Sequence, residues 1–104
     1  MEIKHHKKLT AEKWQELSFY EQMGNIGSEI SRARNPLNQE KAVERALELI
    51  DLTLVDPKLK HKKELARTRE ILCDTVYGEN QYNTSLEDLD NYFFHFALAA
   101  RSKK

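Results

Sequence analysis

Residues 14–34 read WQELSFYEQMGNIGSEISRAR, and this stretch decides the fold. Its apolar residues recur every three or four positions, which keeps them on one side of an α-helix: Phe19, Met23, Ile26, Ile30 and Ala33. Beside this stripe runs a row of small or flat residues: Tyr20, Gly24, Gly27 and Ser31. A glycine inside a helix costs about 1 kcal/mol relative to alanine, so we expect another backbone to approach closely across this row. The pattern predicts a central helix over residues 10–34 that starts at a Thr10 cap, with the other helices packed around it.

The composition places the chain in the helical class. Its 104 residues suffice for one domain, and 33% of them are charged while three are glycine and two are proline. This balance favours helices over a β fold with many turns. Basic and acidic residues number 17 each, so the net charge names no partner. The single cysteine, Cys73, excludes an internal disulfide, and no apolar run approaches the roughly 20 residues that span a bilayer. We therefore expect a cytoplasmic protein with no membrane partner.

Three further helices are expected after the central one, over residues 37–55, 58–77 and 85–101. Asn35–Pro36 and Asp56–Pro57 separate the first of them from its neighbours, because the residue before a proline is pushed out of the α region. Gly78 is expected to end the next helix by supplying a left-handed residue. The run Thr84-Ser85-Leu86-Glu87 matches a capping box at the start of the last helix.

These elements predict an all-α fold, a single-domain antiparallel up-down four-helix bundle over residues 10–101. Residues 1–9 are expected to be a disordered polar tail, and residues 102–104 a second tail.

Arg69 occupies an unusual place, since it lies on the apolar row of the helix expected over residues 58–77. A buried arginine needs a carboxylate partner. Glu29 or Asp51 on the earlier helices could supply one, and Arg69 with Glu29 is the candidate buried ion pair. A structural role for this arginine is favoured over a catalytic one.

No catalytic, metal or cofactor motif stands out. Di-iron helical bundles use Glu-x-x-His pairs, whereas Lys58 and Tyr92 stand three residues before His61 and His95. The chain also lacks His-Glu-x-x-His, Cys-x-x-Cys and a glycine-rich phosphate loop. Cys73 and His95 could face each other as nucleophile and base, but a cysteine among apolar residues is more often inert packing. We therefore expect no enzymatic activity, no cofactor and no metal.

Charge order is more informative than the charge total. In an up-down bundle with short loops, most basic residues gather at one end of the rod. This basic end supplies the candidate contacts for anions or nucleic acid: Lys58, Lys60, Lys62, Lys63 and Arg101. The simpler interpretation is a solvated surface.

The last helix carries more apolar surface than a bundle needs. Its inward row is Leu89, Phe93, Phe96 and Ala100, and Phe94 and Leu98 lie beyond that row. Self-association would bury the excess, and a two-fold homodimer is the commonest way to do so. The candidate interface consists of Tyr20, Gly24, Gly27, Phe94 and Leu98. The competing expectation is that other parts of the same chain cover these groups.

Three runs carry a resemblance: WQELSFYEQMGNIGSE over residues 14–29, ALELIDLT over 46–53 and FALAAR over 96–101. They resemble a group of short, uncharacterised prokaryotic proteins, and the similarity spans about residues 14–101. The resemblance implies a small intracellular helical protein and no particular site. Taken together, these features favour a non-enzymatic protein-interaction or oligomerisation module, with a nucleic-acid-binding module that uses the basic end as the alternative.

Overall fold

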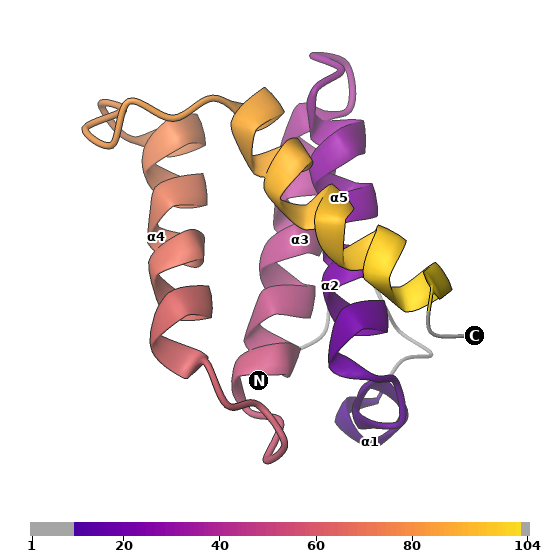
Figure 1. The fold of residues 1–104 in the computed structure, drawn as a ribbon. Helices are drawn as coiled ribbons and strands as arrows, with labels where there is room; N and C mark the ends of the chain where they lie inside the picture. Colours follow the sequence, from indigo (N-terminus) through magenta and orange to yellow (C-terminus); the bar gives the residue numbers. More distant parts are fainter. Residues whose placement is uncertain (1–9, 103–104) are drawn as a thin grey trace.

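The computed structural model describes residues 10–102 and is all-helical over that range (Figure 1). Its helices are α1 (Ala11–Gln15), α2 (Phe19–Ala33), α3 (Gln39–Leu54), α4 (Lys62–Tyr77) and α5 (Leu86–Ser102). The all-α class predicted from the sequence is confirmed. The tail predicted over residues 1–9 lies outside the described residues, whereas Ser102 belongs to α5 and not to the second tail.

Helix α2 is the centre of the molecule. It packs most extensively against α5 and α3, and α4 packs on the far side of α3. Figure 1 shows α3 and α4 side by side, with α5 crossing α2 obliquely. The middle of the apolar stripe on α2 is fully buried: Met23, Ile26 and Ile30 are no more than 1% exposed and share one core with Phe93 and Ile50, whereas Phe19 is only partly buried. The stripe that the spacing predicted is therefore the core face of the central helix.

The row of small residues on α2 lies against α5. A Cβ added at Gly27 would stand 2.7 Å from Cβ of Phe93, and one added at Gly24 would stand 3.4 Å from Cα of Ala97. The expected close approach of a second backbone is confirmed, and the backbone that approaches is α5 of the same chain. Absence of a side chain at Gly27 lets the two helices cross this closely.

The prediction of one helix over residues 10–34 is wrong, because the chain breaks before Phe19. The Thr10 cap is confirmed: its hydroxyl accepts a hydrogen bond from the Lys13 N–H at 3.1 Å, but that helix ends at Gln15. A second helix, α2, starts at Ser18, which is its N-cap. The Ser18 hydroxyl accepts from the Glu21 N–H, and the Glu21 carboxylate accepts from the Ser18 N–H, both at 3.1 Å. This reciprocal pair satisfies donors at a new helix start and lets the chain change direction there.

A buried polar network fixes α1 against the rest of the fold. The Trp14 indole donates to the Thr53 hydroxyl at 2.9 Å, and the Gln22 amide donates to the Trp14 carbonyl and to the Asp56 carboxylate at 2.9 Å each. All four residues are at most 3% exposed. The buried donors of Trp14, Gln22 and Thr53 all find acceptors, so the network ties α1, α2 and the end of α3 together without the cost of a buried, unpaired donor.

Asp56 also fixes the link between α3 and α4. Its carboxylate accepts hydrogen bonds from the Lys58 N–H at 3.0 Å and from the Lys58 ammonium. Burial alone would raise the pKa of Asp56, but the hydrogen bonds from Lys58 and Gln22 bring that pKa below its ordinary value. This turn places Lys58 outside any helix. Helix α4 therefore begins at Lys62 rather than at residue 58.

Three other helix ends differ from the sequence expectation in detail. Helix α3 begins at Gln39 rather than at residue 37. The capping box of α5 is shifted by one residue: the Ser85 hydroxyl accepts from the Asp88 N–H and the Asp88 carboxylate accepts from the Ser85 N–H, both at 3.1 Å. Gly78 ends α4 in an extended conformation, so the left-handed prediction for it is wrong. Its glycine is explained instead by crowding, because an added Cβ would lie 3.0 Å from Cα of Asp74.

No helix within residues 10–102 is both long and apolar enough to cross a membrane.

Candidate functional site

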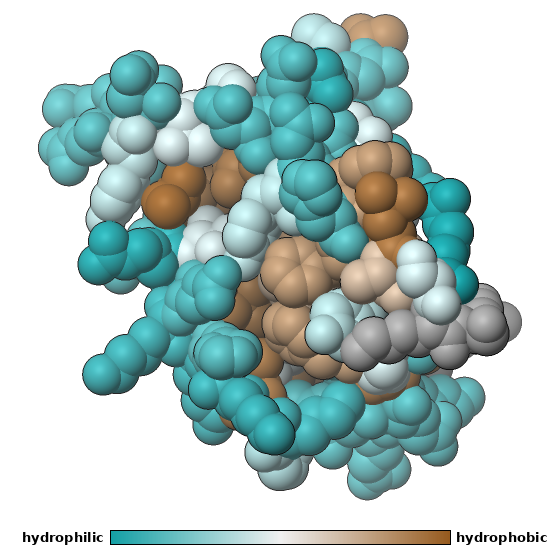
Figure 2. All heavy atoms as spheres, in the orientation of Figure 1, coloured by the Kyte–Doolittle hydropathy of each residue, from teal (hydrophilic) through white to brown (hydrophobic). Residues whose placement is uncertain are grey.

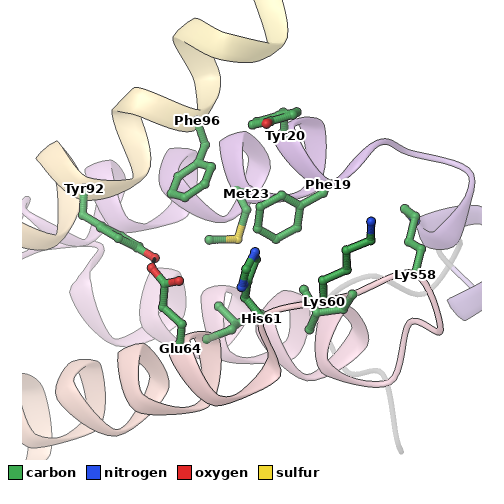
Figure 3. A pocket seen from close by; sticks show the side chains of 11 residues that line it. Phe19, Tyr20, Met23, Lys58, Lys60, His61, Glu64, Tyr92 and Phe96 are labelled. Carbon is green, nitrogen blue, oxygen red and sulfur yellow. Dashed lines mark hydrogen bonds between the residues drawn. The ribbon is translucent and has the colours of Figure 1, made fainter.

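A surface pocket lies where the start of α2, the α3–α4 link, the start of α4 and the middle of α5 meet (Figure 3). Its volume is about 470 Å³, which is within the range of small-molecule sites. The apolar and aromatic lining residues are Phe19, Tyr20, Met23, Leu59, Leu65, Tyr92 and Phe96. The charged or ionisable ones are Lys58, Lys60, His61 and Glu64. The site is thus an aromatic cup with a polar rim.

The rings of the cup hold one another in place. Phe96 meets Phe19 edge-on, with ring centroids 5.5 Å apart and an interplanar angle of 88°. Tyr92 meets Phe96 in the same way at 5.3 Å, and Tyr20 lies 6.4 Å from Phe96. Edge-to-face pairs of this kind are worth about 0.5–1.5 kcal/mol beyond their burial. Met23, which is 1% exposed, lies beneath them, so the floor is apolar and formed before any ligand arrives.

One end of the pocket is closed by a tyrosine–carboxylate pair. The Tyr92 hydroxyl donates to Glu64 Oε1 at 2.9 Å. Burial, and after it the hydrogen bond to Glu64, raise the pKa of Tyr92 to about 12. Tyr92 therefore stays protonated at neutral pH and continues to donate. It occupies one oxygen of Glu64, the one carboxylate among the described residues that line the pocket.

The other end of the pocket is basic. Figure 3 places Lys60 at the end away from Glu64 and Tyr92, with the His61 ring between them. Lys60 and His61 are exposed, and their side chains form no hydrogen bond or ion pair with another of the residues from 10 to 102. Lys58 differs, because its ammonium donates to the Gln15 carbonyl at 2.8 Å and is paired with Asp56.

The five basic residues predicted to form one binding surface therefore have different roles in the structure. Lys58 serves the fold and Lys60 lines the pocket. Lys62 and Lys63 are exposed in the first turn of α4 and do not line the pocket, and Arg101 is exposed near the end of α5. The structure thus brings one of the five predicted cations into a concave site without using it in the fold.

The predicted ion pair between Arg69 and Glu29 is wrong. Arg69 Nε donates to Asp51 Oδ1 at 2.8 Å, and this hydrogen bond is the main cause that raises the pKa of the guanidinium. Glu29, which is 5% exposed, instead accepts from Arg32 at 2.9 Å and from Arg45 at 3.1 Å. Arg69 thus pairs with Asp51, the other candidate carboxylate, across the contact between α3 and α4. Its side chain is 38% exposed, so the pair is a surface feature and not a buried one.

Only part of the candidate oligomer interface is exposed in the structure. Phe94 and Leu98 are 50% and 41% exposed on the outward side of α5. Gly27 is buried beneath Phe93, and Gly24 lies against α5, so neither glycine is available to a second chain. Tyr20 is half-buried and belongs to the aromatic cup. The inclusion of the small-residue row in an interface between chains is therefore corrected: that row serves contact within the chain.

Figure 2 shows where apolar side chains reach the surface. In the orientation of Figure 1, brown and tan side chains gather at the centre of the face and teal side chains surround them. An apolar patch rimmed by polar groups is the arrangement expected of a binding surface.

The residues predicted to carry chemistry do not form a cluster. Cys73 is half-buried on α4, His95 is exposed on α5, and no hydrogen bond joins them. Across the part of the chain from Thr10 to Ser102, no group of three or more His, Cys, Asp or Glu side chains could hold a metal ion.

Sequence reasoning missed the pocket, although part of its signal was present. Tyr92 and Phe96 are four residues apart on α5, which places both rings on one side of the helix, and Phe19 and Tyr20 follow the overlooked Ser18 cap. Their convergence with Lys60 and His61 depends on how the helices cross, which no local pattern records. In comparisons with known proteins, no protein-family model, curated protein or solved structure matches the chain, so the site rests on its own geometry.

Proposed function

We propose that this protein is a non-enzymatic helical module that binds protein, and that its first partner is a second copy of the same chain. The outward side of α5 would be the contact. The observation that carries this proposal is the exposure of two large apolar side chains there, Phe94 at 50% and Leu98 at 41%. They are four residues apart on one helix, so they form a single patch.

A two-fold contact suits this patch. If two α5 helices met antiparallel, Phe94 of each copy would lie beside Leu98 of the other, and the contact would be made twice. Such self-complementary interfaces are the commonest form of homodimer. The exposed His95 next to Phe94 would lie at the edge of the contact.

The size of the patch sets the expected strength. Full burial of a large apolar side chain is worth about 1.5–3 kcal/mol, and Phe94 and Leu98 are already about half buried, so each would gain about 1 kcal/mol. Four such side chains gain about as much as the lower estimates of the cost of association, which start near 4 kcal/mol. These four side chains therefore only offset the cost of association, and a dimer at high micromolar concentration needs about 5 kcal/mol more, which the contacts around them would have to supply. We therefore expect at most a weak dimer rather than a permanent one.

Sedimentation equilibrium over a range of concentrations tests the proposal. The mass should rise from 12.2 kDa towards twice that value with concentration. Phe94→Glu should abolish the rise while the helical circular dichroism is unchanged. Leu37→Glu is the matched control, because Leu37 is 93% exposed at the α2–α3 turn and the same change there should leave the dimer intact. A mass of 12.2 kDa at every concentration, or equal effects of both variants, refutes the proposal.

We also propose how the helices are arranged and in which cellular compartment the protein lies. We take α2, α3, α4 and α5 as the four members of an antiparallel bundle in which α5 is inclined. The succession of four long helices joined by short connections supports this arrangement. We likewise place the protein in the cytoplasm, among the small prokaryotic helical proteins that its sequence resembles. The lone cysteine, which is free, supports a reducing compartment.

Nucleic acid is the second candidate partner, because Lys60, Lys62 and Lys63 are exposed within four residues. Lys58 weakens this candidate, since its ammonium is engaged by Asp56 and Gln15. Fluorescence anisotropy with labelled single- and double-stranded oligonucleotides distinguishes the two. Binding that appears only at low salt indicates a general electrostatic surface, whereas binding that persists at physiological salt favours the nucleic-acid function.

A further inference from the structure

The aromatic pocket has three properties of a ligand site that self-association through α5 does not use. It is concave and of small-molecule size, its floor is apolar, and its ionisable groups are separated towards opposite ends. Phe94 and Leu98, which carry the proposed dimer, do not line it.

We propose that the pocket binds a small aromatic carboxylate, with the ring in the aromatic cup and the carboxylate at Lys60 and His61. The floor selects a flat apolar body. Phe96 stands edge-on to Phe19 at 88° and inclined to Tyr92 at 69°, so the three rings form walls against which a further ring can make offset or edge contacts.

The charges of the rim select an anion at one end. The Lys60 ammonium and the His61 imidazole are adjacent in the chain and have no partner among the described residues, so both have donors to offer. Glu64, the one carboxylate that residues 10–102 contribute to the lining, accepts from Tyr92 at the opposite end. A ligand carboxylate therefore meets donors at the Lys60 end and would meet a negative charge at the other, which fixes its orientation.

The link that carries the donors is held in place before binding. The Asp56 carboxylate accepts from the Lys58 N–H at 3.0 Å, the Leu59 N–H donates to the Asp56 carbonyl at 3.1 Å, and the Leu59 side chain is 8% exposed in the core. A preformed loop reduces the ordering cost that a ligand must overcome. The Lys60 backbone therefore needs no refolding to present its ammonium.

The test uses 2-naphthoate as the probe and 2-naphthamide as its neutral analogue of nearly equal shape, with the full chain in both cases. Isothermal titration gives each affinity, and amide chemical shifts in a nitrogen-15 NMR spectrum locate the binding. We expect naphthoate to bind about tenfold or more tightly than the amide, as one charge-assisted contact implies. The shifts should gather at the start of α2, the α3–α4 link and Tyr92.

Two matched variants distinguish binding in the pocket from nonspecific attraction to positive charge on the surface. Lys60→Met should weaken naphthoate about tenfold and leave the amide unchanged, since it removes the charge and keeps an unbranched apolar side chain. Lys62→Met, two residues on and outside the pocket, should change neither affinity. Both residues are exposed, so both variants should fold.

Several results would overturn the proposal. These are equal affinities for the acid and the amide, equal weakening by the two variants, shifts centred on Phe94 and Leu98, or no binding of naphthoate at millimolar concentration. Loss of naphthoate affinity as the protein concentration rises would show that a second copy fills the pocket, and this also overturns it. Sedimentation equilibrium measures self-association of each variant separately from ligand binding, so failure of the pocket and failure of the α5 dimer are distinguishable.

Discussion

Replacement of Gly24 by alanine should give a more stable protein than replacement of Gly27, although the two residues are only three positions apart on α2. Both changes remove a glycine from a helix interior, which by itself favours the folded state by about 1 kcal/mol. They differ in what the new methyl group meets. At Gly24 it would stand 3.4 Å from Cα of Ala97, which is ordinary contact. At Gly27 it would stand 2.7 Å from Cβ of Phe93, a distance that real Cβ atoms essentially never adopt.

The magnitude follows from how little α5 can yield at this point. The atom that clashes is the Cβ of Phe93, which moves only with its backbone, and Phe93 is 1% exposed in the core. Forcing a methylene-sized group into such a contact costs about 1–3 kcal/mol. We therefore expect Gly24→Ala to stabilise the protein by up to about 1 kcal/mol, and Gly27→Ala to be about 1–3 kcal/mol less stable than Gly24→Ala.

Thermal and urea unfolding, followed by circular dichroism, measure this difference directly. For a domain of this size each kcal/mol corresponds to about 4–8 °C in Tm. Each variant is the control of the other. Both replace a glycine by alanine in the same helix, so the gain in helix propensity is the same. If Gly27→Ala is as stable as Gly24→Ala or more stable, then α2 and α5 are not in close contact at Gly27 and the reasoning is wrong.

Three further predictions concern polar contacts. Asp56→Asn should cost about 1.5–3 kcal/mol at neutral pH, because it removes the charge that Lys58 pairs with. Since the pKa of Asp56 is lowered from 3.8, its contribution is present above that value and is lost as the pH falls through the folded-state pKa, so the variant should show a flatter acid limb of stability in urea titrations. Arg69→Met should change the free energy of unfolding by only about 0.2–1 kcal/mol, since its pair with Asp51 is more than one-third exposed on both sides; a loss of several kcal/mol would contradict this assignment. Ser18→Ala should cost about 0.5–2 kcal/mol in the same assay and Ser18→Gly much less, and no loss from the alanine change would show that the cap does not hold the start of α2.

The sequence by itself determined the features that depend on near neighbours in the chain. The all-helical class, the buried stripe through Met23, Ile26 and Ile30, and the close approach across Gly24 and Gly27 all follow from periodicity and residue size. The Thr10 cap follows from local chemistry in the same way. The pattern Ser18-Phe19-Tyr20-Glu21 was equally readable as a helix start, and the continuous apolar spacing through it led to the prediction of one long helix.

The tertiary structure decided which distant residues meet. Two carboxylates could have paired with Arg69, and the α3–α4 contact selected Asp51 while Glu29 was taken by Arg32 and Arg45. The small row of α2 could have faced another chain, and the oblique crossing of α5 covered it instead.

The pocket shows the same limit most clearly, since its walls come from three stretches far apart in the sequence, around residues 19–23, 58–65 and 92–96. Helix periodicity states which side of each helix is apolar, but it carries no information on the angle at which two such sides cross. That angle is set by how side chains interlock over the whole core, where Phe93 packs directly against Gly27. It leaves the rings of Phe19 and Phe96 facing a cavity, and so only the assembled fold could reveal the site.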